Sequence, residues 1–319
     1  MTNLFEYDQK VLGAYGTTAY ESESWGIKLG LRTEYTDLST LLTNTGEDNT
    51  QNFINLFPSA HTSYKLNERI SFQAGYSRRI YRPRLWDLNP FFNIRNTFSI
   101  RAGNPLLTPE YTDSYEIGSI FIFEGISFNI NAFHRFTTDK IDRISSFENN
   151  VNIFAPENVG TSNTTGLEFN FKYSPLNKLT INGDGNYNYF VRSGTFNDQV
   201  FDFQNDQWST KITTKLKVNK SFDIEVTERY QSGVQTVQGM TSENIYTDLG
   251  MRYKILNGKA VFNFSIRDIF ASRIRESFTL GDDFSAYSFR QSGRFMTLGF
   301  SYGFGKGEAI TYGGGGRRR

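Results

Sequence analysis

The sequence of 319 residues contains no cysteine and only two histidines. The absence of cysteine excludes disulfides, thiolate metal sites and cysteine nucleophiles. The histidines, His61 and His134, fall in different predicted hairpins, and neither has an acid and a nucleophile nearby in the arrangement of a catalytic triad. We therefore predict that the chain is not an enzyme, and we predict no cofactor and no metal site.

Long apolar runs are also missing. No stretch approaches the roughly 18 uninterrupted apolar residues of a membrane helix, so any membrane span has to consist of β-strands. The net charge of +1 gives no reason to expect nucleic acid as a partner. Only 38% of the residues are hydrophobic, whereas 16% are aromatic, with 30 Phe and 18 Tyr. Few aliphatic and many aromatic residues are typical of a transmembrane β-barrel with aromatic girdles at its interfaces.

Alternation of apolar and polar residues runs through most of the chain. Between Trp25 and Tyr35 the odd positions are Trp, Ile, Leu, Leu, Thr and Tyr, and the even positions are Gly, Lys, Gly, Arg and Glu. This period of two is that of a β-strand, and about 9 to 11 residues suffice for a tilted strand to cross a bilayer. Similar runs predict about thirteen strands, longer than the mean of about 5 to 6 residues in soluble domains.

The connections between these strands alternate in length. Short turns are predicted near 67–68, 124–125, 174–177, 219–220 and 256–258, and long polar loops near 43–52, 78–115, 146–164, 193–206, 233–243 and 272–287. Outer-membrane barrels have short periplasmic turns and long extracellular loops. The fold class that we predict is all-β, an antiparallel transmembrane barrel in meander order.

The segment from Arg78 to Tyr115 interrupts the alternation. Four X-Pro steps, which end at Pro83, Pro90, Pro105 and Pro109, favour extended or turn geometry and remove backbone donors, so a helix or central strand is not expected here. A long loop of this kind is usually functional. It is either a ligand mouth or a loop packed on itself by its aromatic residues.

The C-terminal region holds a candidate assembly signal. The last predicted strand, 294–304, ends in aromatic residues, and its polar-x-Gly-x-x-aromatic-x-aromatic pattern is that of the terminal strand recognised by the barrel-assembly machinery. The matching residues are Thr297, Gly299, Tyr302 and Phe304. Residues 1–304 are thus predicted to form the barrel domain, and the Gly/Arg-rich stretch 305–319 a flexible tail. An odd strand count and the lack of a signal peptide suggest the C-terminal part of a longer protein.

A block of short motifs carries a resemblance to a known family. Its parts, all in the first 118 residues, are Tyr76-Ser77-Arg78-Arg79, Arg82-Pro83, Leu88-Asn89-Pro90-Phe91, Gly103-Asn104-Pro105-x-Leu107-x-Pro109-Glu110 and Glu116-x-Gly118. With this block the chain resembles the C-terminal barrel half of TonB-dependent receptors and the related outer-membrane β-barrel family common in Bacteroidetes. The resemblance implies a 22-stranded barrel with a plugged lumen, of which about thirteen strands are present here, and a location in the bacterial outer membrane. The family's signal peptide, plug domain and TonB box have no counterpart in this sequence.

The resemblance also implies a function. The full-length protein is expected to take up a nutrient, such as a siderophore or an oligosaccharide, with the TonB complex as a partner through the missing N-terminal region. The alternative is a non-transporting surface barrel, such as an adhesin or a structural porin-like protein. Further expected partners are outer-membrane lipid, the barrel-assembly machinery and an unknown small-molecule ligand. The candidate ligand-binding residues lie in the segment 78–115: Arg82, Arg84, Trp86, Asn89, Phe91 and Arg95.

The side chains predicted to face the lumen carry more positive than negative charges. They are Lys28, Arg32, Glu34, Arg79, Glu116, Lys211, Lys215, Arg229, Arg252 and Arg267. This excess either steers an anionic ligand, or it hydrates the lumen and holds a plug domain. We favour the second interpretation, because a lumen is polar whatever it carries. His61 and His134 are interpreted as interface or lumen residues.

Overall fold

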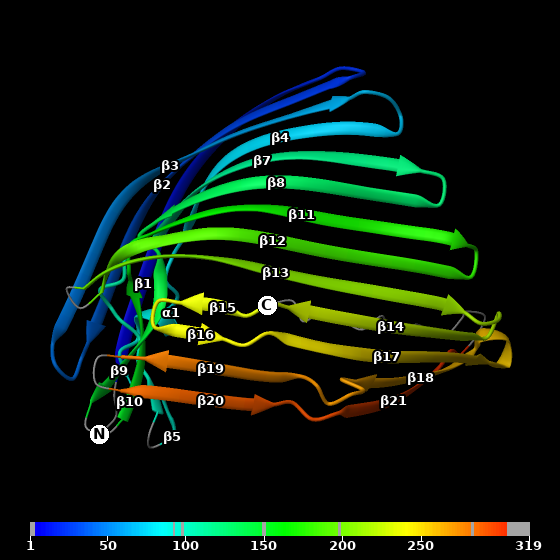
Figure 1. The fold of residues 1–319 in the computed structure, drawn as a ribbon. Helices are drawn as coiled ribbons and strands as arrows, with labels where there is room; N and C mark the ends of the chain where they lie inside the picture. Colours follow the sequence, from blue (N-terminus) through cyan, green and yellow to red (C-terminus); the bar gives the residue numbers. More distant parts are fainter. Residues whose placement is uncertain are drawn as a thin grey trace.

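A single antiparallel sheet of 13 strands dominates the computed structural model, which describes residues 4–91, 93–96, 99–148, 151–196, 199–281 and 284–304 (Figure 1). Each strand of the sheet pairs with the next strand of the sheet along the chain. The strands are β1 (Phe5–Glu21), β2 (Trp25–Leu42), β3 (Glu47–Lys65), β4 (Ile70–Tyr81), β7 (Glu110–Phe123), β8 (Ile126–Thr138), β11 (Thr161–Leu176), β12 (Leu179–Phe196), β13 (Gln199–Lys217), β14 (Phe222–Gln231), β17 (Asn244–Ile255), β18 (Ala260–Arg267) and β21 (Phe295–Tyr302). The predicted thirteen-stranded antiparallel meander is confirmed.

The sheet curves into a trough with two different faces. Lys28, His61, Gly75 and Glu116 occupy paired positions on adjacent strands, so they share one face. The other face carries large apolar side chains that are open to the surroundings, such as Ile117 at 70% exposure and Leu298 at 71%. Such a surface is stable in lipid rather than in water. The order of strands runs from β1 to β21, and in the described part of the chain these two do not pair with each other.

Aromatic pairs mark two levels on the apolar face. At the end of the sheet with the short turns, cross-strand pairs have ring centroids 4.6 to 6.1 Å apart: Trp25 with Tyr64, Phe121 with Phe128, Phe222 with Tyr253 and Phe262 with Phe300. Nearer the other end, the pairs Tyr76 with Tyr115 and Trp208 with Tyr230 have centroids 5.0 and 5.1 Å apart. Aromatic rings at two levels are typical of the girdles of a membrane barrel.

The two ends of the sheet differ as predicted, with two corrections. The loops predicted near 43–52 and 193–206 are wrong. β2 continues to Leu42 and β3 begins at Glu47, and likewise β12 continues to Phe196 and β13 begins at Gln199. The physical reason is that a backbone ladder continues beyond the apolar band, where the side chains no longer need to alternate. The other long connections lie at this same end, on the left of Figure 1.

Those long connections contain two smaller sheets, where the sequence predicted irregular loops. The first consists of β5 (Asn93–Asn96), β6 (Ser99–Arg101), β9 (Ile141–Glu148) and β10 (Val151–Asn158), and the second of β15 (Val234–Thr236), β16 (Gly239–Thr241), β19 (Ile274–Leu280) and β20 (Ser285–Gln291). A side-chain amide joins them. Gln238 accepts a hydrogen bond from the Ser145 N–H at 2.7 Å and donates one to its carbonyl oxygen at 2.8 Å.

Helices are short. The described part of the chain has no helix with the length and hydropathy to cross a membrane. One helical turn, α1 (Leu85–Leu88), lies in the segment where no helix was expected, and a 3-10 turn, η1 (Leu256–Gly258), joins β17 to β18. The prolines at 83 and 90 bracket α1, which leaves room for one turn, and the Asp87 carboxylate accepts the N–H of Arg84 at 3.1 Å.

Candidate functional site

The connection between β4 and β7, residues 82–109, folds back onto the concave face of β1 and β2. Leu88 and Leu107 are fully buried and pack with Leu38 of β2 in the one apolar cluster of buried residues found in the described part of the chain. Phe5 and Tyr7 of β1 cover this cluster. The segment is therefore a packed structural element, held by leucines against β1 and β2 rather than by its own aromatic residues, and its contact with a ligand stays a prediction.

Gly103 sets the close packing inside this element. A Cβ at this position would lie 2.5 Å from the Asn89 carbonyl oxygen, 2.6 Å from the Asn89 nitrogen and 2.7 Å from the Asp87 carbonyl oxygen. The Gly103 N–H donates to the Asn89 oxygen at 2.8 Å, and the Asn104 N–H donates to the Asp87 oxygen at 2.7 Å. Two backbone segments thus approach each other at the C-terminal end of α1 so closely that only glycine fits at position 103.

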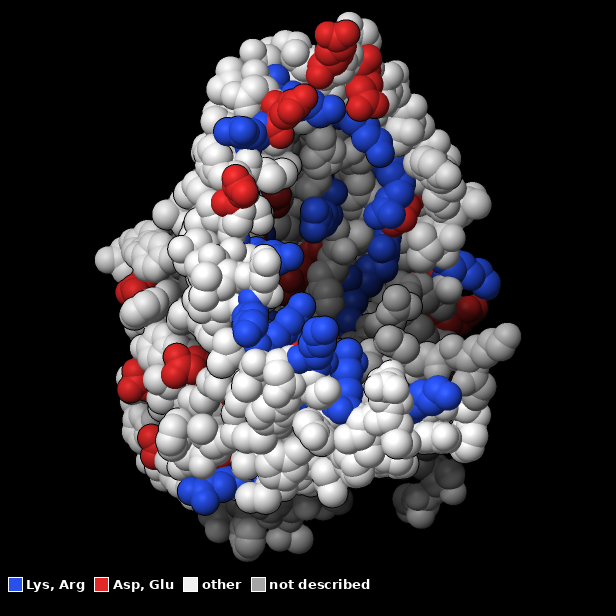
Figure 2. All heavy atoms as spheres, turned by 90° about the vertical axis from the view of Figure 1, so that its right-hand side faces the viewer, with Lys and Arg blue, Asp and Glu red and all other residues white. Residues whose placement is uncertain are grey.

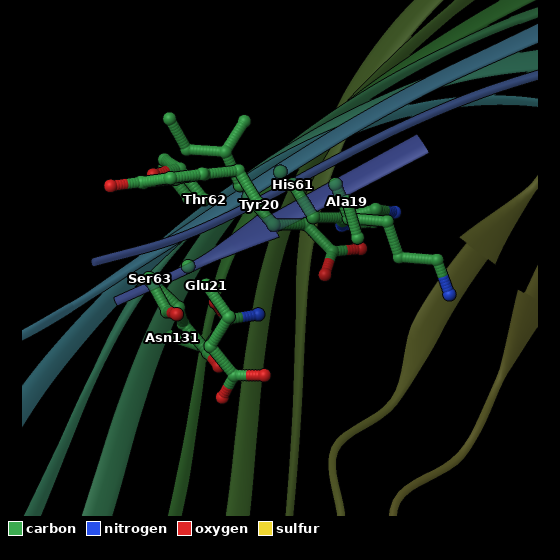
Figure 3. Close-up of a pocket in the computed structure, with 14 residues that line it drawn as sticks. Ala19, Tyr20, Glu21, His61, Thr62, Ser63 and Asn131 are labelled. Atoms are coloured by element: carbon green, nitrogen blue, oxygen red, sulfur yellow. The ribbon is translucent and has the colours of Figure 1, made fainter. Parts of the chain in front are cut away.

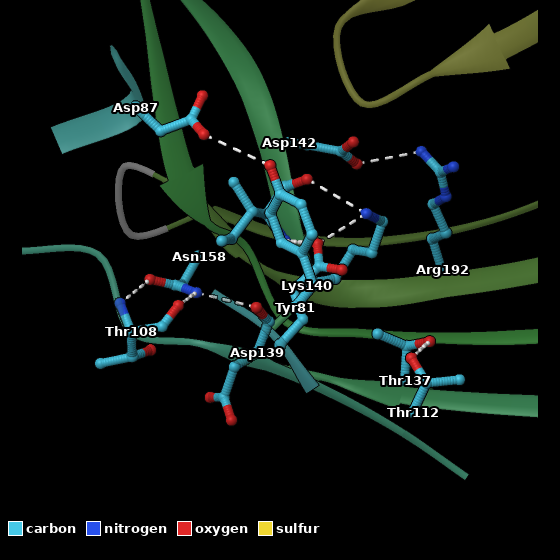
Figure 4. Close-up of polar contacts among 12 residues, drawn as sticks. Tyr81, Asp87, Thr108, Thr112, Thr137, Asp139, Lys140, Asp142, Asn158 and Arg192 are labelled. Atoms are coloured by element: carbon cyan, nitrogen blue, oxygen red, sulfur yellow. Dashed lines mark hydrogen bonds and ion pairs between the residues drawn. The ribbon is translucent and has the colours of Figure 1, made fainter. Parts of the chain in front are cut away.

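Polar contacts fasten the element to the next connection (Figure 4). The Asn158 side chain accepts the Thr108 N–H at 2.9 Å and donates to the carbonyl oxygens of Thr108 and Asp139 at 3.0 and 2.8 Å. The Lys140 ammonium lies 2.7 Å from the Glu110 carboxylate. Each contact replaces water at a backbone or charged group, so the connections support one another at this end of the sheet.

A cavity of about 340 Å³ lies beside α1. It brings together three of the predicted binding residues, Trp86, Asn89 and Phe91. Trp86 is 78% exposed, which leaves its indole free to contact another molecule. The rest of the lining consists of Asp87, Arg101, Ala102, Gly103, Arg143, Phe154 and Pro156.

Arg101 and Arg143 give this cavity a positive charge that was not assigned from the sequence. Phe154 pairs with Arg101 across β10 and β6, and Pro156 pairs with Arg143 across β10 and β9, so all four side chains share one face of the first small sheet. In the described part of the chain neither arginine forms an ion pair or a side-chain hydrogen bond. Free guanidinium groups beside aromatic rings suit an anionic or aromatic ligand. Only the parallel pairing of β6 with β10 brings them together, and no local motif signals it.

The remaining predicted binding residues have other surroundings. Arg82 forms an ion pair with Glu34 of β2 and a hydrogen bond to Thr36 at 3.4 Å, so its guanidinium is occupied within the protein. Arg84 is exposed at the start of α1 and does not line the cavity. Arg95 lies in β5, and its side chain is outside the described part of the structure. Contact of these residues with a ligand stays a prediction.

A second cavity, of about 410 Å³, lies on the sheet near its short turns (Figure 3). His61 lines it together with Lys28 and Glu116. A Cβ on Gly75 would lie 2.8 Å from Nδ1 of His61, so this glycine makes room for the imidazole. His134 lies on the apolar face, where Nδ1 is 2.8 Å from Oγ1 of Thr165. Both histidines were interpreted as interface or lumen residues, and the strand register places His61 on the concave face and His134 on the apolar face.

Positive charge dominates the hollow of the trough when it is viewed from its short-turn end (Figure 2). The charges form local ion pairs along the wall. The Arg135 guanidinium lies 3.5 Å from Glu168 and 4.0 Å from Glu116, and the Lys211 ammonium lies 3.8 Å from Asp184. The strand register places the predicted lumen residues on this face.

The predicted assembly residues lie on β21 and directly after it. Thr297 and Gly299 pair with Ser265 and Asn263 on the concave face. Tyr302 and Phe304 belong to the apolar side, where their rings meet edge to face at 4.8 Å. This placement is compatible with a recognition role, which stays a prediction, and the tail 305–319 lies outside the described residues.

Comparison with known proteins gives the family. The model of the outer membrane protein β-barrel family matches residues 1–302, whereas no curated protein matches the sequence. Among solved structures, the siderophore receptor PiuA from Acinetobacter baumannii has 17% identity and a TM-score of 0.67 over 92% of this chain and 43% of its own. The ferric yersiniabactin uptake receptor FyuA from Yersinia pestis has 13% identity and a TM-score of 0.66 over 93% and 46%.

The copper transporter OprC has 12% identity and a TM-score of 0.69 over 92% of this chain and 48% of its own. This chain therefore spans about half the length of these three proteins. At such identities the similarity establishes the fold, whereas the family model covers nearly the whole chain. The chain belongs to the outer membrane protein β-barrel family and lies in the bacterial outer membrane.

Proposed function

We propose that this chain forms the C-terminal part of the barrel of an outer-membrane receptor that takes up a small nutrient molecule. The long-connection end is the extracellular end, as in other barrels of this kind. The cavity beside α1 captures the ligand there. Trp86, Phe91 and Phe154 provide flat apolar surface, and Arg101 and Arg143 provide positive charge.

The observation that carries this proposal is the pair of arginines in an aromatic cavity at the long-connection end of the sheet, neither of which has an ion-pair partner among the described residues. A protein that only strengthens the membrane needs no concave site that combines aromatic rings with cations. Binding sites, by contrast, are concave and combine apolar surface with a few oriented polar groups. The names of the structural neighbours, two receptors and a transporter, agree with uptake.

In the complete protein, we propose, entry into the lumen requires energy. The TonB complex would act through a region outside this chain and displace a plug domain that closes the lumen. The contribution of this chain is the extracellular cavity and a polar, positively charged wall along which the ligand moves. Outer-membrane lipid would contact the apolar face, and the barrel-assembly machinery would recognise the strand that holds Thr297, Gly299, Tyr302 and Phe304.

Gene deletion tests the uptake function. Cells with and without the gene are grown under iron limitation with siderophores, and separately on oligosaccharides as the carbon source, each in a tonB-positive and a tonB-deficient background. We expect the gene to increase growth on one of these nutrient classes, only when TonB is present. Equal growth in all pairs would favour the alternative, a non-transporting surface barrel.

Point variants test the cavity. Once the nutrient class is known, cells that carry Arg143→Gln or Trp86→Ala should bind the labelled nutrient at least tenfold more weakly, because each change removes a charge or a ring that meets the ligand. The matched control is Arg294→Gln, an exposed arginine just before β21 and away from the cavity. If all three variants bind equally, the capture site lies elsewhere.

A further inference from the structure

A separate cavity of about 250 Å³ lies on the concave wall, at the place where β13, β14 and β17 approach β19. Four positively charged side chains line it, and we call them the wall cluster: Lys211, Arg229, Arg273 and Arg275. A single carboxylate, that of Asp184, is part of the lining. The wall cluster shares no residue with the cavity beside α1.

The strand register places like charges directly opposite each other at this cavity. Lys211 of β13 pairs with Arg229 of β14, and Arg275 of β19 pairs with Arg290 of β20. Directly opposite like charges destabilise an antiparallel pair. Lys211, Arg229 and Arg275 line the cavity together, so their repulsion is unfavourable for folding unless something of opposite charge lies among them.

An aromatic ring holds two of the guanidinium groups in place. The Cζ atoms of Arg229 and Arg273 lie 6.0 and 4.7 Å from the centre of the Tyr246 ring. Stacking on the ring restricts each guanidinium while its N–H edges stay available, since the ring contacts only the flat face. These arginines are therefore oriented before a ligand arrives.

The protein itself satisfies these cations incompletely. The Arg229 Nε is buried without a hydrogen-bond partner, and its nearest carboxylate oxygen, on Asp248, is 4.0 Å away. Lys211 is 3.8 Å from Asp184, which is also too long for a hydrogen bond. In the described residues the side chains of Arg273 and Arg275 have no carboxylate partner within ion-pair distance. A buried donor without an acceptor is costly, so the site lacks an acceptor that carries negative charge.

We propose that the wall cluster binds an oxyanion, a phosphate, sulfate or carboxylate group carried by a small molecule. The planar forks of Arg229 and Arg275 suit two oxygens of such a group, and Lys211 adds a point charge. The hydroxyl of Ser209 at the same cavity can donate a further hydrogen bond. This inference rests on the proposed uptake function, which provides the route by which the ligand reaches the wall. It adds to that function that the imported nutrient carries a negative charge.

The test uses the full-length protein, purified from outer membranes in detergent at low ionic strength. Inorganic phosphate and inorganic sulfate are titrated in by calorimetry, with chloride as the reference anion. We expect both oxyanions to bind the wild-type protein, and we expect citrate, a soluble tricarboxylate, to displace them. Arg275→Glu should weaken phosphate binding at least tenfold, and Arg275→Lys should weaken it several-fold, because the charge stays while the fork is lost.

Arg275→Glu also separates binding from folding. The new carboxylate faces Arg290 across β19 and β20, so this variant should unfold at a higher temperature than the wild type while it loses the anion. Arg273→Gln should weaken binding as well, whereas the matched control Arg69→Gln, in an exposed short turn, should leave it unchanged.

Two results would overturn the proposal: a wild-type protein that binds neither phosphate nor sulfate more tightly than chloride, or an Arg275→Glu variant that binds them as the wild type does. Either result would show that the wall cluster meets only solvent or a protein segment. Because the titration needs no TonB and no energised membrane, its failure leaves the uptake function intact. A failure of the growth test, conversely, does not affect the titration.

Discussion

The guanidinium of Arg82 forms an ion pair with the carboxylate of Glu34, which lies 48 residues earlier in the chain. Arg82 opens the connection between β4 and β7, and Glu34 lies on the concave face of β2. Both side chains are largely withdrawn from solvent, with 20% and 10% of their surface exposed. The pair therefore ties the packed outer element to the barrel wall from within the lumen.

Loss of one partner should release this element. Arg82→Gln removes a cation from the buried Glu34 carboxylate, which keeps the Arg32 guanidinium at 3.3 Å, and we expect a cost of roughly 1–3 kcal/mol in the opening of the segment 82–109. Limited proteolysis within this segment, at protease concentrations where cleavage follows the open population, measures the change. The control is a double-mutant cycle with Glu34→Gln, in which the double variant should open less readily than Arg82→Gln alone. Strict additivity of the two changes would contradict a direct interaction.

Gly103 offers a second test of the same element. In Gly103→Ala the new methyl group overlaps three backbone atoms of Asp87 and Asn89, which cannot move away as a flexible side chain would. We expect a destabilisation of about 1–3 kcal/mol and faster cleavage of the segment 82–109. Gly16→Ala is the matched control, because a Cβ at Gly16 meets nothing within 4 Å. Equal behaviour of the two variants would show that the packing around α1 tolerates a rearrangement.

The sequence predicted the thirteen strands because each one has to face both lumen and lipid, which makes the alternation strict within the membrane. It did not predict β9, β10, β15, β16, β19 and β20, since outside the apolar band both faces of a strand can be polar. Trp86, Asn89 and Phe91 were predicted as binding residues because they lie close together in the chain. Arg101 and Arg143 were missed, because they become neighbours of this group only through pairing with β10. The sequence also gave no sign that Arg82 pairs with Glu34 rather than with a ligand.

Glu157 makes the stability of the first small sheet depend on pH. This residue lies on β10 at the extracellular end, and its partial burial raises the pKa of its carboxyl group. Asp142 lies directly opposite it on β9, and Asp142 is itself paired with Arg192 at 2.9 Å. The fold thus favours the protonated form of Glu157. Its contribution to stability is present below the unfolded pKa and is lost as the pH rises through the higher folded pKa.

Glu157→Gln should therefore raise the thermal unfolding midpoint at pH 7, where the wild-type carboxylate is ionised in a poorly solvated place. Near pH 4 and below, the two proteins should unfold at the same temperature, since the wild-type group is then neutral as well. A series of melting curves between pH 4 and 7 measures this difference. Glu124→Gln, in an exposed turn, is the control and should show none. A variant that is less stable than the wild type at pH 7 would mean that Glu157 has a favourable ionic partner.

The aromatic end of the last strand lends itself to a test of assembly. Phe304 is 89% exposed, and its ring contacts the ring of Tyr302 edge to face. Its removal hardly changes the packing of the protein, so Phe304→Ala should leave the stability of the folded barrel almost unaffected. If the assembly machinery recognises this residue, the fraction of folded protein in the outer membrane should nevertheless fall several-fold. Heat-modifiable migration in gels measures that fraction.

Phe289→Ala in β20, an exposed ring outside the last strand, is the control and should assemble normally, because the machinery acts on the terminal strand. Equal folded fractions for the two variants would show that recognition does not use Phe304.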